Sequence, residues 1–151
     1  MINDVIIKQI NKYEDDRGYL MEIFRSDDLN NYIPAMSYVS FTNPGIIRGP
    51  HEHKDQSDAF VFIGPGNFSL HLWDRRSGSS TQSEKMELEV GANNPCLVIV
   101  PPGVVHGYKC ISGEAAMSIN LPDKLYKGQN KADEIDEIRW ELDPASPYKI
   151  S

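Results

Sequence analysis

Short runs of hydrophobic and β-branched residues recur along this chain between turn-forming residues. We expect strands at residues 4–9, 19–24, 36–41, 59–63, 67–73, 85–90, 97–100, 107–111 and 114–121. Gly and Pro separate several of these runs as turn-forming triplets at residues 43–45, 64–66 and 101–103. Evenly spaced short strands without long amphipathic helices are typical of a β-sandwich or barrel. The pattern therefore predicts an all-β fold.

The C-terminal quarter differs from this pattern. Residues 126–141 are polar and acidic, and the stretch 133–138 offers at most a turn or two of helix. Trp140 and Tyr148 supply apolar anchors, so we expect the end of the chain to dock on the barrel. With no linker or repeat in sight, residues 1–151 are interpreted as a single domain.

Composition narrows the class of protein. The 151 residues are 40% hydrophobic, which is enough for one domain with a sizeable core. No apolar run approaches the roughly 20 residues of a membrane helix, and the N-terminus lacks the features of a signal peptide. We therefore expect a cytoplasmic protein with no membrane partner. Cys96 and Cys110 have neither metal-clip nor redox spacing, and we interpret both as buried thiols.

The net charge of the chain limits which kinds of ligand it can bind. The chain carries 22 acids against 15 bases, a net charge of -7, and the bases are scattered along it. This argues against nucleic acid, whose binding depends on clustered cations. An anionic small molecule remains compatible, because a few arginines can hold a diphosphate locally whatever the overall charge.

Three of the four histidines fall in two short motifs. His51 and His53 lie two residues apart, so in a strand both rings project from one face, close to Arg48. His106 follows the turn at residues 101–103. A lone histidine is more often structural, but two at this spacing beside an arginine indicate a functional site. Imidazole can transfer a proton, hydrogen-bond or bind a metal.

Metal binding is one interpretation of these residues. The candidate ligands are His51, His53, Asp58 and His106. They resemble the ligand set of metal-binding cupins, with Asp58 at the place of that motif's glutamate. Carboxylate ligation by an aspartate is chemically reasonable.

A wider resemblance covers most of the chain. Its five motifs, in order, are residues 16–22 (DRGYLME), 45–51 (GIIRGPH), 74–81 (DRRSGSST), 99–107 (IVPPGVVHG) and 138–144 (IRWELDP). Together they resemble the dTDP-4-dehydrorhamnose 3,5-epimerase family. The resemblance implies a cupin-type, double-stranded jelly roll and a homodimer with exchanged N-terminal strands. It also implies no required cofactor, and a nucleotide-linked 4-keto sugar as substrate.

The resemblance also implies roles for single residues. His51 takes the position of the general base that removes a proton next to the ketone, and Asp143 that of its carboxylate partner. His53 is a further candidate for proton transfer. The substrate-binding candidates are Arg48 and His106 at the sugar, and Arg17 and Glu22 in the motif that contacts nucleotide. We expect Asp74 and Arg76 to form a structural ion pair instead.

Two expected residues are replaced. The lysine that stabilises the enolate in the family falls at or beside Ala59, and the tyrosine that protonates the opposite face falls near Asn120. Alanine offers no donor, and an amide is not a general acid near neutral pH. Tyr38 and Tyr126 are the candidates for a replacement acid.

Two other functions stay open. Residues 48–54 (RGPHEHK) resemble the motif of dTDP-sugar 3,4-ketoisomerases, in which both histidines are catalytic. A non-catalytic sugar-nucleotide-binding cupin is the other alternative, motivated by the replaced lysine and tyrosine. The remaining motifs favour the epimerase family.

Overall fold

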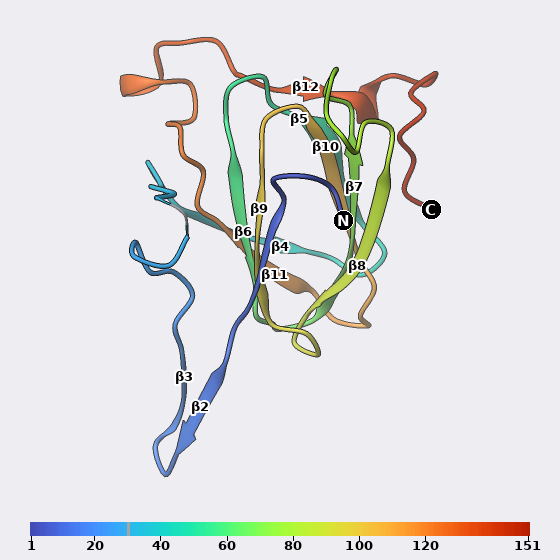
Figure 1. Ribbon diagram of the computed structural model, residues 1–151. Helices are drawn as coiled ribbons and strands as arrows, with labels where there is room; N and C mark the ends of the chain where they lie inside the picture. Colours follow the sequence, from blue (N-terminus) through green and yellow to red (C-terminus); the bar gives the residue numbers. More distant parts are fainter. Residues whose placement is uncertain (30) are drawn as a thin grey trace.

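Two five-stranded antiparallel sheets form the body of the computed structural model, which describes residues 1–29 and 31–151 (Figure 1). The first sheet has the order β1 (Ile6–Gln9), β9 (Cys96–Val100), β6 (Asp58–Phe62), β11 (Ala116–Asn120), β4 (Tyr38–Thr42). The second has the order β12 (Ile138–Arg139), β5 (Ile47–Glu52), β10 (Val104–Cys110), β7 (Asn67–Asp74), β8 (Lys85–Gly91). This is a jelly roll, so the predicted fold class is confirmed.

Strand β6 shows how the sequence builds the core. All five of its residues are buried, and their side chains alternate between two hydrophobic clusters. Phe60 and Phe62 belong to the cluster between the sheets, whereas Ala59 and Val61 belong to a second cluster with Ile10 and the loop before β4. A strand that is covered on both faces has a nearly continuous run of apolar residues. This run is why the strand could be predicted from the sequence.

The strand at residues 12–15 and strand β5 were missed from the sequence, whereas the strand at residues 18–21 overlaps the expected segment 19–24. The hairpin of β2 (Lys12–Asp15) and β3 (Gly18–Met21) stands away from the body (Figure 1), and β2 is entirely exposed, so it has no buried face to mark it. Strand β5 contains Gly49 and Pro50, which usually argue against a strand. A Cβ on Gly49 would come within 2.8 Å of the His106 carbonyl oxygen, and φ is 79° there. Glycine thus lets β5 approach β10 closely.

The predicted helical turn at residues 133–138 is wrong in position. Short 3-10 turns occupy Gln129–Lys131 and Trp140–Leu142 instead, and Ile138–Arg139 form strand β12. The cause is tertiary: the Asp136 carboxylate accepts hydrogen bonds from the backbone N–H groups of residues 54–56. This segment is therefore held extended against the end of β5.

Other expectations about structural residues are confirmed. Trp140 packs edge-on against Tyr148 with ring centroids 5.1 Å apart, and Tyr148 also meets Trp73 of β7, so the C-terminus docks on the second sheet. Asp74 pairs with Arg76, whose hydrogen bonds hold the pKa of that carboxyl well below its ordinary value. Both cysteines are buried and free. No helix within residues 1–29 and 31–151 is long and apolar enough to cross a membrane.

Candidate active site

A cavity of about 1030 Å³ opens at one end of the jelly roll. His51 and His53 line it from the second sheet, and Tyr38 from β4 of the first. Most of the remaining wall comes from the segments 122–131 and 133–139, with residues 35–36 and 55–56 completing it. Backbone contacts of Asp136 with residues 54–56 fix that wall to the loop after β5.

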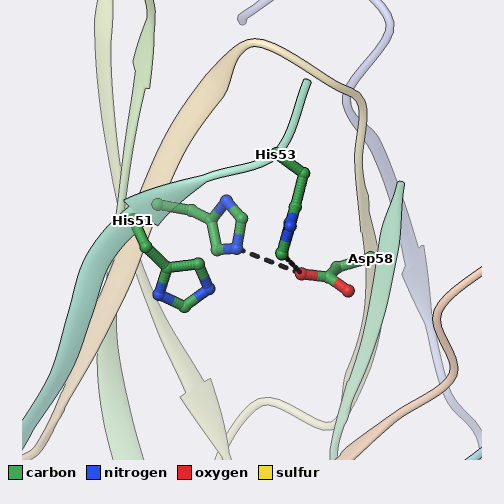
Figure 2. A group of neighbouring side chains, drawn as sticks. His51, His53 and Asp58 are labelled. Carbon is green, nitrogen blue, oxygen red and sulfur yellow. Dashed lines mark ion pairs between the residues drawn. The ribbon is translucent and has the colours of Figure 1, made fainter. Parts of the chain in front are cut away.

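Three histidines meet at the inner wall because two neighbouring strands carry them. His51 on β5 stands opposite His106 on β10 in the antiparallel register, and their ring centroids are 4.5 Å apart. His53 lies just beyond β5, 5.5 Å from His51. Figure 2 shows the side chains of His51, His53 and Asp58 gathered around one point. The structure thus brings together the three histidines that the motifs indicated.

Asp58, the first residue of β6, links two of these rings. Its Oδ2 atom lies 3.0 Å from Nε2 of His53 and 3.3 Å from Nε2 of His106. Its Oδ1 atom accepts hydrogen bonds from the amides of Gln56 at 2.9 Å and Asn120 at 3.0 Å. Burial raises the pKa of Asp58, but the hydrogen bonds to the two histidines outweigh it and hold that pKa well below its ordinary value.

The protonation of the two flanking histidines differs. Burial, and then the charges of His106 and His53, lower the pKa of His51 well below its ordinary value, so this ring is neutral at physiological pH. Burial also lowers the pKa of His53, but the hydrogen bond and charge of Asp58 outweigh it and raise that pKa. His51 is therefore the flanking ring that is present in its unprotonated form.

A carboxylate that sequence reasoning missed lies next to His51. Glu137 places Oε1 3.9 Å from Nε2 of His51, and its other oxygen accepts a hydrogen bond from Arg139 at 2.6 Å. Arg139 in turn stands opposite His51 in the β12–β5 ladder. The only sequence signal was the acidic run at residues 133–137, which carries no recognisable spacing.

Tyr38 brings a phenol to the cavity from the other sheet. Asn120 stands opposite Tyr38 in the β11–β4 register and donates a hydrogen bond to its hydroxyl oxygen at 2.8 Å. Burial raises the pKa of Tyr38 to about 12, so the phenol keeps its proton near neutral pH. Tyr126 also lines the cavity. A phenol thus reaches the neighbourhood of Asn120 from the adjacent strand.

His106 and Asp58 are buried behind the cavity wall, and four further predicted site residues do not line the cavity as the described part of one chain forms it. Asp143 instead accepts a hydrogen bond from the backbone N–H of Ala145 at 2.9 Å, so the structure does not bring it to His51. Arg48 bonds Thr42 and the Phe41 carbonyl on the neighbouring strand β4.

The other two lie on or near the hairpin. Arg17 is in its turn and pairs with Asp15, and Glu22 follows β3 and pairs with Arg25. The hairpin stands away from the body of its own chain (Figure 1), and neither residue lines the cavity.

The family model described as dTDP-4-dehydrorhamnose 3,5-epimerase matches residues 1–146. The chain belongs to this family. The epimerase Agl13 of Haloferax volcanii, described as a probable low-salt glycan biosynthesis epimerase, is 36% identical over 135 residues, covering 88% of this chain and 86% of that protein. The spore coat polysaccharide biosynthesis protein SpsL of Bacillus subtilis is 32% identical over 143 residues, covering 93% and 91%.

Solved structures agree on the fold. A dTDP sugar isomerase from Desulfovibrio desulfuricans superimposes with a TM-score of 0.83 at 18% identity, covering 98% of this chain and 91% of that one. The family and enzyme class that the sequence motifs predicted are therefore confirmed: this is a member of the sugar epimerases and isomerases.

Proposed function

We propose that the protein epimerises a dTDP-linked 4-keto-6-deoxy sugar, with His51 as the base that removes the proton next to the ketone. The observation that supports this most is a neutral, largely buried imidazole on one sheet and a protonated phenol on the other, both lining one cavity. A carbon centre is inverted when a base takes its proton on one face and an acid returns one on the other.

The base in this proposal is already unprotonated at physiological pH. His51 is uncharged because burial and the neighbouring histidines penalise its imidazolium form. Once it has taken a proton, the carboxylate of Glu137 stabilises the new charge from 3.9 Å. We assign Glu137 the role that the sequence resemblance gave to Asp143. His53 lines the same cavity, and His106 lies buried behind it with its ring against His51.

Tyr38 is the acid in this proposal and replaces the tyrosine expected near Asn120. Asn120 occupies the acceptor side of the phenol oxygen, which leaves the hydroxyl proton free to point at a ligand. Its raised pKa keeps that proton available. The acid has thus moved from β11 to the paired position on β4.

Binding of the nucleotide is proposed to require a second copy of the chain. Six acidic side chains line the cavity against four basic ones, so one chain offers a poor site for a diphosphate. The acids are Asp55, Asp123, Asp133, Glu134, Asp136 and Glu137, and the bases are Lys124, Lys127, Lys131 and Arg139. A cation from outside the chain would offset this excess of negative charge.

The exposed hairpin and β4 support such a homodimer. Tyr19 and Leu20 on the hairpin are 64% and 60% exposed, and Val39 and Phe41 on the open edge strand β4 are 56% and 55% exposed. Apolar side chains beside an unpaired strand edge suit strand addition. In an exchanged dimer the hairpin covers the partner's β4, and Arg17 of the partner subunit supplies a cation to the nucleotide.

A cytoplasmic location is part of the proposal. Two free, buried cysteines without a disulfide suit a reducing compartment.

Proton exchange tests the proposed reaction directly. The purified protein is incubated with dTDP-4-keto-6-deoxyglucose in heavy water, and the ring protons are followed by NMR. We expect deuterium at C3, C5 or both, with formation of an epimer. A 3-keto product would show the ketoisomerase instead, for which the adjacent rings of His51 and His53 provide two proton carriers. Tight binding without exchange would show a non-catalytic binder.

A further inference from the structure

Among the described residues that line the cavity, Arg139 of strand β12 is the one arginine. It stands opposite His51 in the ladder of β12 and β5. Residues directly opposite in an antiparallel pair carry their side chains on the same face, with Cβ atoms about 4.5–5.5 Å apart. Arg139 therefore extends from the same side of the sheet as the proposed base.

No sequence motif assigned Arg139 to the site. The arginine expected at the sugar was Arg48, whose guanidinium bonds Thr42 and the Phe41 carbonyl and does not line the cavity. The other basic side chains of the described wall, apart from histidines, are lysines, which bind phosphate as point charges. A planar guanidinium can instead bond two phosphate oxygens at once. Arg139 is thus the group of this wall best suited to a diphosphate.

One carboxylate holds Arg139 in the described part of the chain. Nε of Arg139 donates a hydrogen bond to Oε2 of Glu137 at 2.6 Å, and the remaining N–H groups of the guanidinium bond no other described residue. The side chain of Glu137 is 16% exposed, whereas that of Arg139 is 50% exposed. The carboxylate is therefore enclosed, and the cation keeps free donors beside the cavity that it lines.

Glu137 lies between two partners and is bonded to only one of them. Its Oε1 atom stays 3.9 Å from Nε2 of His51, beyond hydrogen-bond reach, while Oε2 is bonded to Arg139. A half-exposed ion pair of this kind is weak, and it changes an equilibrium constant by only about two- to fivefold. The anion of a ligand in the cavity can therefore displace Glu137 from the guanidinium.

We propose that Arg139 changes partner when a nucleoside diphosphate enters the cavity: its guanidinium moves from Glu137 to a phosphate oxygen, and the released carboxylate turns to His51. This change of partner is called the Arg139 switch below. It rests on the proposed function, since it concerns the same base and substrate. Glu137 holds the cation until the substrate's own anion replaces it, so the base gains its carboxylate partner only when substrate is bound.

Calorimetric titration with dTDP tests the switch without any turnover. Glu137→Gln removes the competing carboxylate, so dTDP should bind about two- to fivefold more tightly than to the wild type. Arg139→Gln removes the phosphate contact, so dTDP should bind about 10- to 100-fold more weakly. Unchanged or weaker binding in Glu137→Gln, or unchanged binding in Arg139→Gln, would overturn the proposal.

The double variant distinguishes the switch from a general effect of charge. Without Arg139 there is no cation for Glu137 to withhold, so Glu137→Gln should give no gain in the Arg139→Gln background. Glu134→Gln is the matched control, because it removes the same charge from the same wall, and Glu134 forms no ion pair with Arg139 in the described part of the chain. Any gain from Glu134→Gln should be equal in both backgrounds. An equal gain from Glu137→Gln in both backgrounds would contradict the switch.

Thymidine, which lacks phosphates, identifies the part of the ligand that Arg139 contacts. Its affinity should be the same for the wild type, Arg139→Gln and Glu137→Gln. A change as large as that seen with dTDP would show that the contact is not with phosphate and would refute the proposal.

Arg139→Lys gives an independent check that does not depend on how well Arg139→Gln folds. A lysine restores the charge without the planar fork, so dTDP should bind with an affinity between those of the wild type and Arg139→Gln. Thermal unfolding of each variant verifies that the fold is kept, which we expect because the ion pair is half exposed. A folded Arg139→Lys protein that binds dTDP no better than Arg139→Gln would contradict a contact with an anion.

Proton exchange in heavy water distinguishes failure of the switch from failure of the proposed reaction. If dTDP binding follows the expected pattern and the keto sugar exchanges no proton, the reaction is wrong and the switch stands. If the keto sugar exchanges protons and Glu137→Gln does not tighten dTDP binding, the switch alone is wrong. In active enzyme, Glu137→Gln should lower KM and kcat together, whereas Arg139→Gln should raise KM.

Discussion

The cavity wall that carries the histidines and the N-terminal hairpin differ in where their contacts come from. The side chains of the wall find their partners within the same chain, whereas apolar side chains of the hairpin stay exposed. At the wall formed by the three histidines and Asp58, the hydrogen-bond partners come from neighbouring strands and from the segment 133–139 of the same chain. The hairpin of β2 and β3 instead leaves Tyr19 and Leu20 exposed, and strand β4 offers an unpaired edge. In the proposed dimer, the chemistry is therefore contained in one chain, whereas recognition of the nucleotide is shared between two.

His51→Asn is expected to have the largest effect on activity, because it removes the proposed base. Proton exchange at the sugar should fall by about 10²- to 10⁴-fold, the usual contribution of general base catalysis. Heavy-water NMR measures it, with His71→Asn as the control outside the cavity. Unchanged proton exchange would show that His51 is not the base.

Tyr38→Phe separates the two faces of the sugar. Without the phenol, His51 still removes and returns a proton on its own face, so deuterium should still enter the substrate. Formation of the inverted product should fall by about 100-fold. Comparing isotope incorporation with epimer formation checks this. An equal loss of both would mean that Tyr38 is not the acid of the opposite face.

Val39→Lys tests the proposed contact between the hairpin and strand β4 of a second chain. A lysine on the open edge of β4 should prevent addition of the partner's hairpin. We expect a monomer by sedimentation velocity, with a raised KM for the dTDP-sugar. Lys124→Gln, on the rim of the cavity, is the control that should stay dimeric. A Val39→Lys protein that remains a dimer would contradict the proposed interface.

Arg17→Gln tests whether the hairpin contacts the nucleotide. A charge-assisted hydrogen bond to phosphate contributes about 1.5–3 kcal/mol, so KM should rise about 10- to 100-fold with little change in kcat. Lys12→Gln on the same hairpin is the matched control, since it removes one positive charge from strand β2 rather than from the turn. Steady-state kinetics measures KM for Arg17→Gln and Lys12→Gln. Equal KM values for the two variants would exclude a contact between Arg17 and the nucleotide.

Glu137→Gln should give the smallest effect. A carboxylate 3.9 Å from the ring interacts weakly, by up to about 1 kcal/mol, so kcat should fall about fivefold. Asp143→Asn, at the residue first indicated by sequence, should leave kcat unchanged. A larger loss in Asp143→Asn than in Glu137→Gln would restore Asp143 as the partner of His51.

Much of the jelly roll could be predicted because its strands bury a face. Strand β6 and strand β9 appear as continuous apolar runs, and both were located within a residue or two. The hairpin strand β2 has no buried residue within its own chain, and β5 is disguised by Gly49 and Pro50. Hydrophobic patterning reports burial within the chain, so it does not locate a strand without a buried face or one whose close approach depends on glycine.

The sequence by itself determined the family, the jelly roll and the identity of the three histidines, because those depend on local motifs and on alternation along single strands. Tertiary structure decided which groups surround them. Asp143 does not reach His51, and Glu137 lies beside that ring instead. Tyr38 contacts Asn120, and Asp58 lies between two imidazoles. These pairings join residues far apart in sequence, and their distances depend on strand register and on a loop held by Asp136, neither of which local patterns specify.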